Sequence, residues 1–133
     1  MSCNSAIYCA NTSKQTLVEG GAIPFGSVVR RFGKNVQMDG QNIVLMGSGY
    51  YDVTVSATIS PTAIGDVSIQ LYQDGVAVQG ATASATAAAA NDFVDLVIPC
   101  LVRNCGCDCN TVLSLVVDAA GTLENLGTVV KKV

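Results

Sequence analysis

Apolar and polar side chains alternate along residues 49–59, and the rest of the chain is organised around this stretch. The apolar residues occupy the odd positions Tyr51, Val53, Val55, Ala57 and Ile59. The even positions carry mostly polar side chains, from Tyr50 to Thr58. Because successive side chains of a strand point to opposite faces, this pattern predicts a strand with one buried and one polar face. Glycines precede the stretch and Ser60-Pro61 follows it, so we expect the long inner strand of a sandwich or barrel.

Shorter patterns of the same kind predict further strands on both sides of this stretch. The expected strands cover residues 6–10, 15–18, 22–30, 36–38, 41–46, 67–72, 76–78, 93–98, 113–118 and 123–133. Pro24 has no N–H for a ladder, so we expect an edge or a bulge there, and we expect Pro99 to end or bulge its strand. Residues 80–90 are rich in Ala, Thr and Ser, and we predict a strand and a loop there instead of a helix.

Two Asp-Gly pairs predict tight hairpins. Asp39-Gly40 joins two of the expected strands and Asp74-Gly75 joins two others. Both residue types accept the positive φ angles of a two-residue hairpin turn. About nine to eleven short strands with frequent turn signals and no helical period predict an all-β fold. We therefore expect a two-sheet antiparallel β-sandwich, or jelly roll, as a single domain over residues 1–133.

The composition indicates a globular chain and favours an assembly. Half of the 133 residues are apolar and 13% are charged, which excludes intrinsic disorder. With so few charged residues, the chain has more apolar surface than one small core can bury. A homo-oligomer interface usually buries such excess apolar surface. Residues 43–46 are apolar on both faces. One face can join the core, and we expect a neighbouring subunit to cover the other.

Charge and hydropathy argue against two classes of partner. The formal net charge is −3 and the seven basic residues are scattered, whereas nucleic-acid binding requires a basic face. No run approaches the roughly 18 apolar residues of a membrane helix. Residues 1–5 lack the features of a signal peptide, so we expect the protein to remain in the producing cell or to leave by lysis or assembly.

The sequence offers little catalytic chemistry. It contains no His, which removes Ser-His-Asp and Cys-His catalysis and histidine metal sites. Asp92 and Asp95 flank Phe93 on an expected strand, and we interpret them as solvated carboxylates, not as a catalytic pair. We therefore expect neither an enzyme nor a cofactor.

Cysteines gather in residues 105–109. Cys105, Cys107 and Cys109 stand at alternate positions, and Cys100 lies just upstream. Three interpretations remain open. The thiols can be free or structural, they can form disulfides with Cys100, Cys3 or Cys9 or between subunits, or they can hold a soft metal such as Zn²⁺. The metal is the least favoured because the spacing is unlike that of paired CxxC motifs.

Three segments resemble the compact jelly roll of the complement-globular-head and tumour necrosis factor superfamily. They are Gly49-Tyr50-Tyr51-Asp52-Val53, the hairpin segment 69–75 and the closing segment 126–130. In that superfamily a Gly-x-Tyr-x-Val strand precedes such a hairpin, and the final strand runs beside the N-terminal strand. The chain looks closer to small bacterial and phage-encoded members. It departs from animal members in its few aromatic residues and its cysteine-rich segment.

The resemblance implies a homotrimer packed about a threefold axis. By motif position it places Tyr51 and Val53, or Tyr50 on the opposite face, at or near that axis. Ile43, Leu45 and Met46 would then be adjacent to it. The pattern alone leaves open which face is core and which is interface.

These features predict a structural, non-enzymatic trimer that decorates or caps a larger assembly. We expect a phage virion decoration or head-fibre type protein, located in the virion with other structural proteins as partners. The alternative is a receptor- or glycan-binding module at a fibre tip or at a bacterial cell or spore surface. The loops offer few aromatic residues for such a site, which counts against the alternative.

Overall fold

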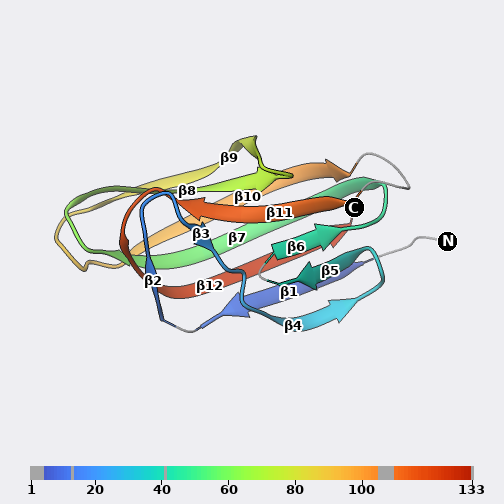
Figure 1. Ribbon diagram of the computed structural model, residues 1–133, viewed down its shortest axis with the longest axis horizontal. Helices are drawn as coiled ribbons and strands as arrows, with labels where there is room; N and C mark the ends of the chain where they lie inside the picture. Colours follow the sequence, from blue (N-terminus) through green and yellow to red (C-terminus); the bar gives the residue numbers. More distant parts are fainter. Residues whose placement is uncertain (1–4, 13, 41, 105–109, 133) are drawn as a thin grey trace.

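The fold is a sandwich of two antiparallel sheets of six strands each. Figure 1 looks onto the faces of the sheets, so that one sheet lies in front of the other. The computed structural model describes residues 5–12, 14–40, 42–104 and 110–132. These residues contain no helix, so none of them belongs to a helix able to cross a membrane. The prediction of an all-β, two-sheet jelly roll is confirmed.

One sheet, called here the β7 sheet, contains both ends of the chain. Its strands follow the order β10-β7-β12-β1-β4, and β2 also pairs with β12. The strands are β1 (Ala6–Asn11), β2 (Gln15–Leu17), β4 (Ser27–Phe32), β7 (Gly49–Pro61), β10 (Val94–Asn104) and β12 (Gly121–Lys132). The second half of the last strand β12 lies antiparallel to the whole of β1, as the resemblance implied.

The second sheet, called here the β8 sheet, covers the first. Its strands follow the order β5-β6-β11-β8-β9, and β3 also pairs with β11. The strands are β3 (Ala22–Ile23), β5 (Val36–Asp39), β6 (Asn42–Leu45), β8 (Gly65–Gln73), β9 (Val76–Ala87) and β11 (Thr111–Val117).

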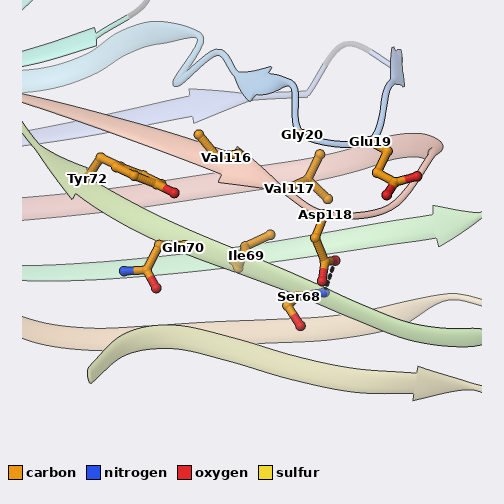
Figure 2. Close-up of a pocket in the computed structure, with 9 residues that line it drawn as sticks. All are labelled: Glu19, Gly20, Ser68, Ile69, Gln70, Tyr72, Val116, Val117 and Asp118. Carbon is orange, nitrogen blue, oxygen red and sulfur yellow. Dashed lines mark hydrogen bonds between the residues drawn. The ribbon is translucent and has the colours of Figure 1, made fainter. Parts of the chain in front are cut away.

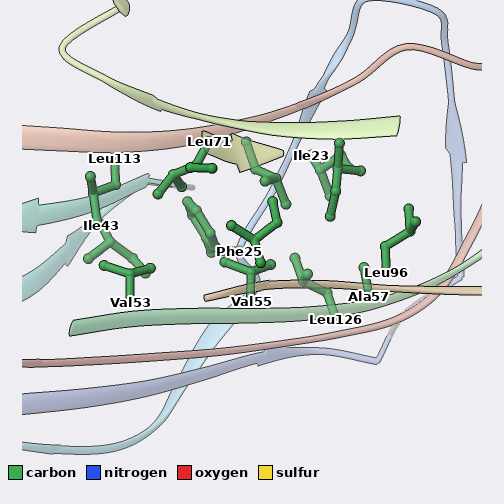
Figure 3. Close-up of a cluster of buried hydrophobic side chains, with 14 of the residues drawn as sticks. Ile23, Phe25, Ile43, Val53, Val55, Ala57, Leu71, Leu96, Leu113 and Leu126 are labelled. Carbon is green, nitrogen blue, oxygen red and sulfur yellow. The ribbon is translucent and has the colours of Figure 1, made fainter. Parts of the chain in front are cut away.

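Strand β7 sits inside its sheet between β10 and β12. The alternation along residues 51–59 directs every apolar odd position into the space between the sheets, where each is at most 2% exposed. Figure 3 shows Val53 and Val55 facing Leu71 and Leu113 of the β8 sheet. The core is therefore a single apolar layer between the two sheets.

Both predicted hairpins are present, but Asp39 is the last residue of β5 and pairs with Asn42, so the prediction that it supplies a positive φ angle to the turn is wrong. Gly40 has a φ of 62° between β5 and β6. Asp74 and Gly75 have φ angles of 53° and 82° between β8 and β9, the two positive values of a type I′ turn. Residues 80–90 are the extended end of β9 followed by a turn, as expected.

The structure differs from the expected strands near two prolines. The segment 22–32 forms two strands, β3 and β4, which belong to different sheets and lie on either side of Pro24. This split raises the strand count to twelve. Strand β10 neither ends nor bulges at Pro99, which pairs in register with Thr54. Because β10 is the edge strand of its sheet, a residue without an N–H is tolerated there.

Candidate assembly surface

Four of the six expected interface residues lie in the core of the single chain. Ile43, Leu45, Tyr51 and Val53 are each 0% exposed. A side chain that is fully buried within one chain cannot contact a neighbouring subunit, so an interface position is wrong for these four. Met46 is half-buried, and only Tyr50, on the opposite face of β7, is widely exposed at 52%.

Tyr51 has a structural role. Its hydroxyl donates to the carbonyl of Gly47 at 2.6 Å and accepts from the N–H of Gly47 at 3.2 Å. Burial raises the pKa of Tyr51, and the hydrogen bond with Gly47 opposes that rise. The buried Asn104 side chain also donates to the Gly47 carbonyl, at 2.9 Å, and accepts from Thr111 at 2.7 Å. These bonds hold the connection between β6 and β7.

The outer face of the β7 sheet carries exposed apolar side chains instead. Val129 lies opposite Tyr8 on β1 and opposite Thr54 on β7, and Thr54 in turn lies opposite Pro99. A row with little charge therefore crosses four strands. More exposed apolar side chains flank this row at Phe32, Val97 and Leu101, which are 61%, 53% and 57% exposed.

This face is hollowed beside Val129. A cavity of about 160 Å³ lies among Ala6, Ile7, Tyr8, Arg30, Phe32 and Val129. Its volume is comparable to that of a cavity able to bind benzene, about 150 Å³. The hollow can therefore receive an apolar side chain.

Most charged groups of β7, β12 and β10 on this face are already paired or hydrogen-bonded. Lys131 lies 3.9 Å from the carboxylate of its cross-strand neighbour Asp52. Asp95 accepts a hydrogen bond from Thr58 at 2.8 Å. Exposed pairs of this kind contribute little to stability, but they lower the cost of covering the face. The carboxylates of Asp92 and Asp95 both belong to exposed residues.

The described cysteines give no disulfide. Cys9 is a buried free thiol and Cys100 a half-buried one. Burial raises the pKa of each thiol to about 11, and the negative charge of Asp52 adds to the shift at Cys100. Cys105, Cys107 and Cys109 lie outside the described residues. In the described part of the chain, no three His, Cys, Asp or Glu residues are grouped to hold a metal ion.

The sequence contains a signal for the outward-facing apolar residues of this surface, although simple alternation of apolar and polar residues does not indicate it. Residues 96–98 and 101–102 are consecutive apolar residues, and so are residues 129–130. In a strand, two successive apolar residues must point to opposite faces, so one of them is left outside the core. Val97, Leu101 and Val129 are the members that point outward.

Comparison with known proteins identifies the fold. No family model and no curated protein sequence matches the chain. Murine APRIL at pH 5.0 superposes with a TM-score of 0.75 at 10% identity, over 98% of this chain and 99% of APRIL. The globular domain of zebrafish complement 1qA gives 0.72 at 8% identity, over 98% and 96%. PRD1 vertex protein P5 gives 0.66 at 16% identity, over 97% and 96%.

At these identities the likeness concerns the fold alone. It extends over nearly the whole length of this chain and of each of these structures. The chain therefore has the compact jelly-roll fold of the tumour necrosis factor and complement-globular-head superfamily, as the sequence motifs indicated.

Proposed function

We propose that this chain is a non-enzymatic structural protein that assembles as a homotrimer and forms part of a phage virion, as a decoration or head-fibre protein. The observation that carries the proposal is the exposed apolar outer face of the β7 sheet. Exposed apolar side chains on β10 and on β12, β1 and β4, on either side of the polar outward row of β7, favour an interaction site on this face. Its position, opposite the covered face of the sheet, leaves it free for a neighbouring subunit.

The layout of this face is compatible with a ring of subunits. The projecting side chains Val97 and Leu101 lie on β10, at one edge of the sheet. The hollow around Val129 and Phe32 lies toward the other edge, among β12, β1 and β4. A projection of one chain can then enter the hollow of the next, which is a heterologous contact, and such contacts form a ring where the rotation between subunits closes. The resemblance to the superfamily supports three subunits.

Two observations support the structural role and the location. The sequence has no His, which removes the commonest general base of enzymes. The fold likeness to the PRD1 vertex protein P5 supports a place in a virion among other structural proteins.

The first test is the mass in solution, by size exclusion with light scattering under reducing and under oxidising conditions. We expect three times the 13.6 kDa chain mass in both. A monomer at micromolar concentration would contradict the proposal. A trimer seen only under oxidising conditions would assign assembly to the cysteines and not to the apolar face.

The location has a separate test in the neighbouring genes. Adjacent capsid and portal genes would support the virion. Collagen-like or spore-coat genes would instead favour the surface or fibre-tip module. Mass spectrometry of purified particles then checks whether the chain is a virion component.

A further inference from the structure

A second hollow lies on the outer face of the β8 sheet, away from the surface proposed for assembly. Its volume is about 360 Å³. Figure 2 shows Tyr72 and Val116 at one end and the carboxylates of Glu19 and Asp118 at the other. Tyr72 belongs to β8 and Val116 to β11, on the solvent side of both strands. The hollow thus joins an aromatic and aliphatic end to an acidic end.

Backbone hydrogen bonds fix the acidic end. The N–H of Gly20 donates to the carbonyl of Val117 at 2.9 Å, and the N–H of Val117 donates to Gly21 at 3.1 Å. These two bonds attach the connection that carries Glu19 to the end of β11. Asp118 and Ser68 are joined twice, because the N–H of Asp118 donates to the Ser68 carbonyl at 3.0 Å and its Oδ1 accepts from the Ser68 N–H at 2.7 Å. Both carboxylates therefore sit on anchored backbone.

The side chains around the hollow offer more acceptors than donors, because the side-chain donors toward it are the hydroxyls of Tyr72 and Ser68, and the Ser68 hydroxyl is already shared with Ser84 at 2.8 Å. Gln70 donates both N–H groups of its amide inward, to the carbonyls of Leu71 and Val78, each at 2.8 Å. Its Oε1 is left as the acceptor. The Oδ2 atom of Asp118 and both carboxylate oxygens of Glu19 remain available as acceptors. Ionised carboxylates accept hydrogen bonds and do not donate them. A ligand that fits this set must itself be rich in donors.

The charges around the hollow restrict the class of ligand further. All seven Lys and Arg residues lie in the described part of the chain, and the ion pairs found there involve Glu124 and Asp52. Neither Glu19 nor Asp118 forms an ion pair with another described residue. Two negative charges at one end of an apolar hollow complement a cation on an aliphatic stem.

We propose that this hollow binds a lysine or arginine side chain of a partner protein. The methylene stem lies against Val116 and the ring of Tyr72, and the cationic head reaches the carboxylates of Glu19 and Asp118. A neutral sugar fits less well, because its hydroxyl groups also need donors from the protein and gain nothing from two negative charges. The proposal does not depend on the oligomeric state of the chain.

The test is an NMR titration of the ¹⁵N-labelled full chain with N-acetyl-lysine methylamide and with the arginine analogue. N-acetyl-norleucine methylamide supplies the same aliphatic stem without the charge. We expect saturable shifts at the amides of Gly20, Ser68, Tyr72 and Val116 with the two cations, and weak ones with norleucine. Absent shifts, or equal shifts with norleucine, would overturn the proposal.

Two isosteric variants locate the binding. Glu19→Gln changes an exposed loop residue and should weaken binding roughly 1.5- to five-fold, since exposed ion pairs are individually modest. Adding Asp118→Asn keeps an oxygen for the Ser68 N–H and should remove the preference for cations over norleucine. The control Asp39→Asn/Asp92→Asn changes the net charge equally at exposed sites elsewhere and should bind as the natural chain does.

Two outcomes would contradict the assignment. Unchanged affinity in the Glu19→Gln/Asp118→Asn variant would show that the cations bind elsewhere. Shifts at these same amides with N-acetylglucosamine, and none with the lysine probe, would assign the hollow to a neutral sugar.

Discussion

At the scale of single residues, one buried hydroxyl stands out. Thr128 is 0% exposed, and within the described structure its Oγ1 has no hydrogen-bond partner. Thr128 lies on β12 opposite Cys9 and Val55, in the core layer. A buried polar group without a partner keeps its full desolvation cost, about 1–3 kcal/mol. The hydroxyl therefore lowers the stability of the fold.

We predict that Thr128→Val raises the free energy of unfolding by about 1–2 kcal/mol, because the shape is kept and the unpartnered hydroxyl is removed. Urea denaturation measures the change. The matched control Thr128→Ser keeps the hydroxyl and deletes the methyl group, and it should be less stable than the natural chain. A less stable valine variant would show that the hydroxyl does have a partner.

The buried thiol of Cys9 leads to a prediction of pH dependence. Its pKa is about 11 in the folded chain, against 9.0 for an ordinary thiol. Between these two values the unfolded chain releases the proton and the folded chain keeps it. The unfolded state then binds fewer protons, so stability falls as pH rises through that window.

The measurement is the urea midpoint at steps from pH 8 to pH 10.5. We expect the midpoint of the natural chain to fall above pH 9 more steeply than that of Cys9→Ala. Other alkaline groups titrate equally in both proteins, so the difference in slope isolates the thiol. Parallel curves would mean that Cys9 ionises as readily in the folded state as in the unfolded one.

At the scale of strands, two glycines differ in the space around them and in their backbone conformation. Comparing them shows where the fold requires glycine and where it tolerates a side chain. Gly26 connects β3 to β4 with a φ of 94°, and an added Cβ would overlap the backbone of Ala10. Gly127 lies in β12, where an added Cβ would meet only the Tyr8 ring, at 3.9 Å. One position requires glycine, and the other does not.

We predict that Gly26→Ala lowers the free energy of unfolding by about 2–4 kcal/mol, through overlap and a left-handed φ. Gly127→Ala should raise it by about 0.5–1 kcal/mol, because alanine loses less entropy in a strand and covers part of the ring. Thermal and urea unfolding of the pair provide the check. Similar losses in both variants would contradict this distinction.

Strand-level features differ in how far the sequence specifies them. The alternation of residues 51–59 names the buried face directly, because one face is apolar and the other polar. The Asp74-Gly75 turn is equally local, since two positive φ angles select those residue types. The continuation of β10 through Pro99 is not local. It depends on β10 being an edge strand, which follows from the order of strands in the sheet and not from residues 93–104.

The assembly surface on the β7 sheet and the hollow on the β8 sheet also depend on features that no local sequence pattern specifies. The motif resemblance pointed to strand β7 but left open which of its faces is core, and the face of Tyr51 and Val53 belongs to the core. In the hollow on the β8 sheet, Glu19 and Asp118 are far apart in the sequence. They line the same hollow because the 18–21 turn is hydrogen-bonded to the end of β11. No local pattern in either segment indicates this meeting.

At the scale of the whole molecule, the proposed trimer depends on one face of one sheet. Val129 lies in the middle of that face, between Tyr8 and Thr54, and lines its hollow. Val76 provides a matched comparison, because it is a 70% exposed valine at the start of β9, in the other sheet. A lysine at either position can extend into solvent in an isolated chain.

We predict that Val129→Lys yields a folded monomer, because three charges would otherwise be enclosed in the assembled ring without partners. Val76→Lys should remain a trimer. Light scattering gives the mass of each variant, and circular dichroism confirms that the Val129 variant keeps its β structure. If both variants remain trimers, the subunits meet through another surface and the outer face of the β7 sheet is open to a different partner. If both variants become monomers, the added charge disrupts the trimer from either sheet. The assignment of the outer face of the β7 sheet to the subunit contact then fails.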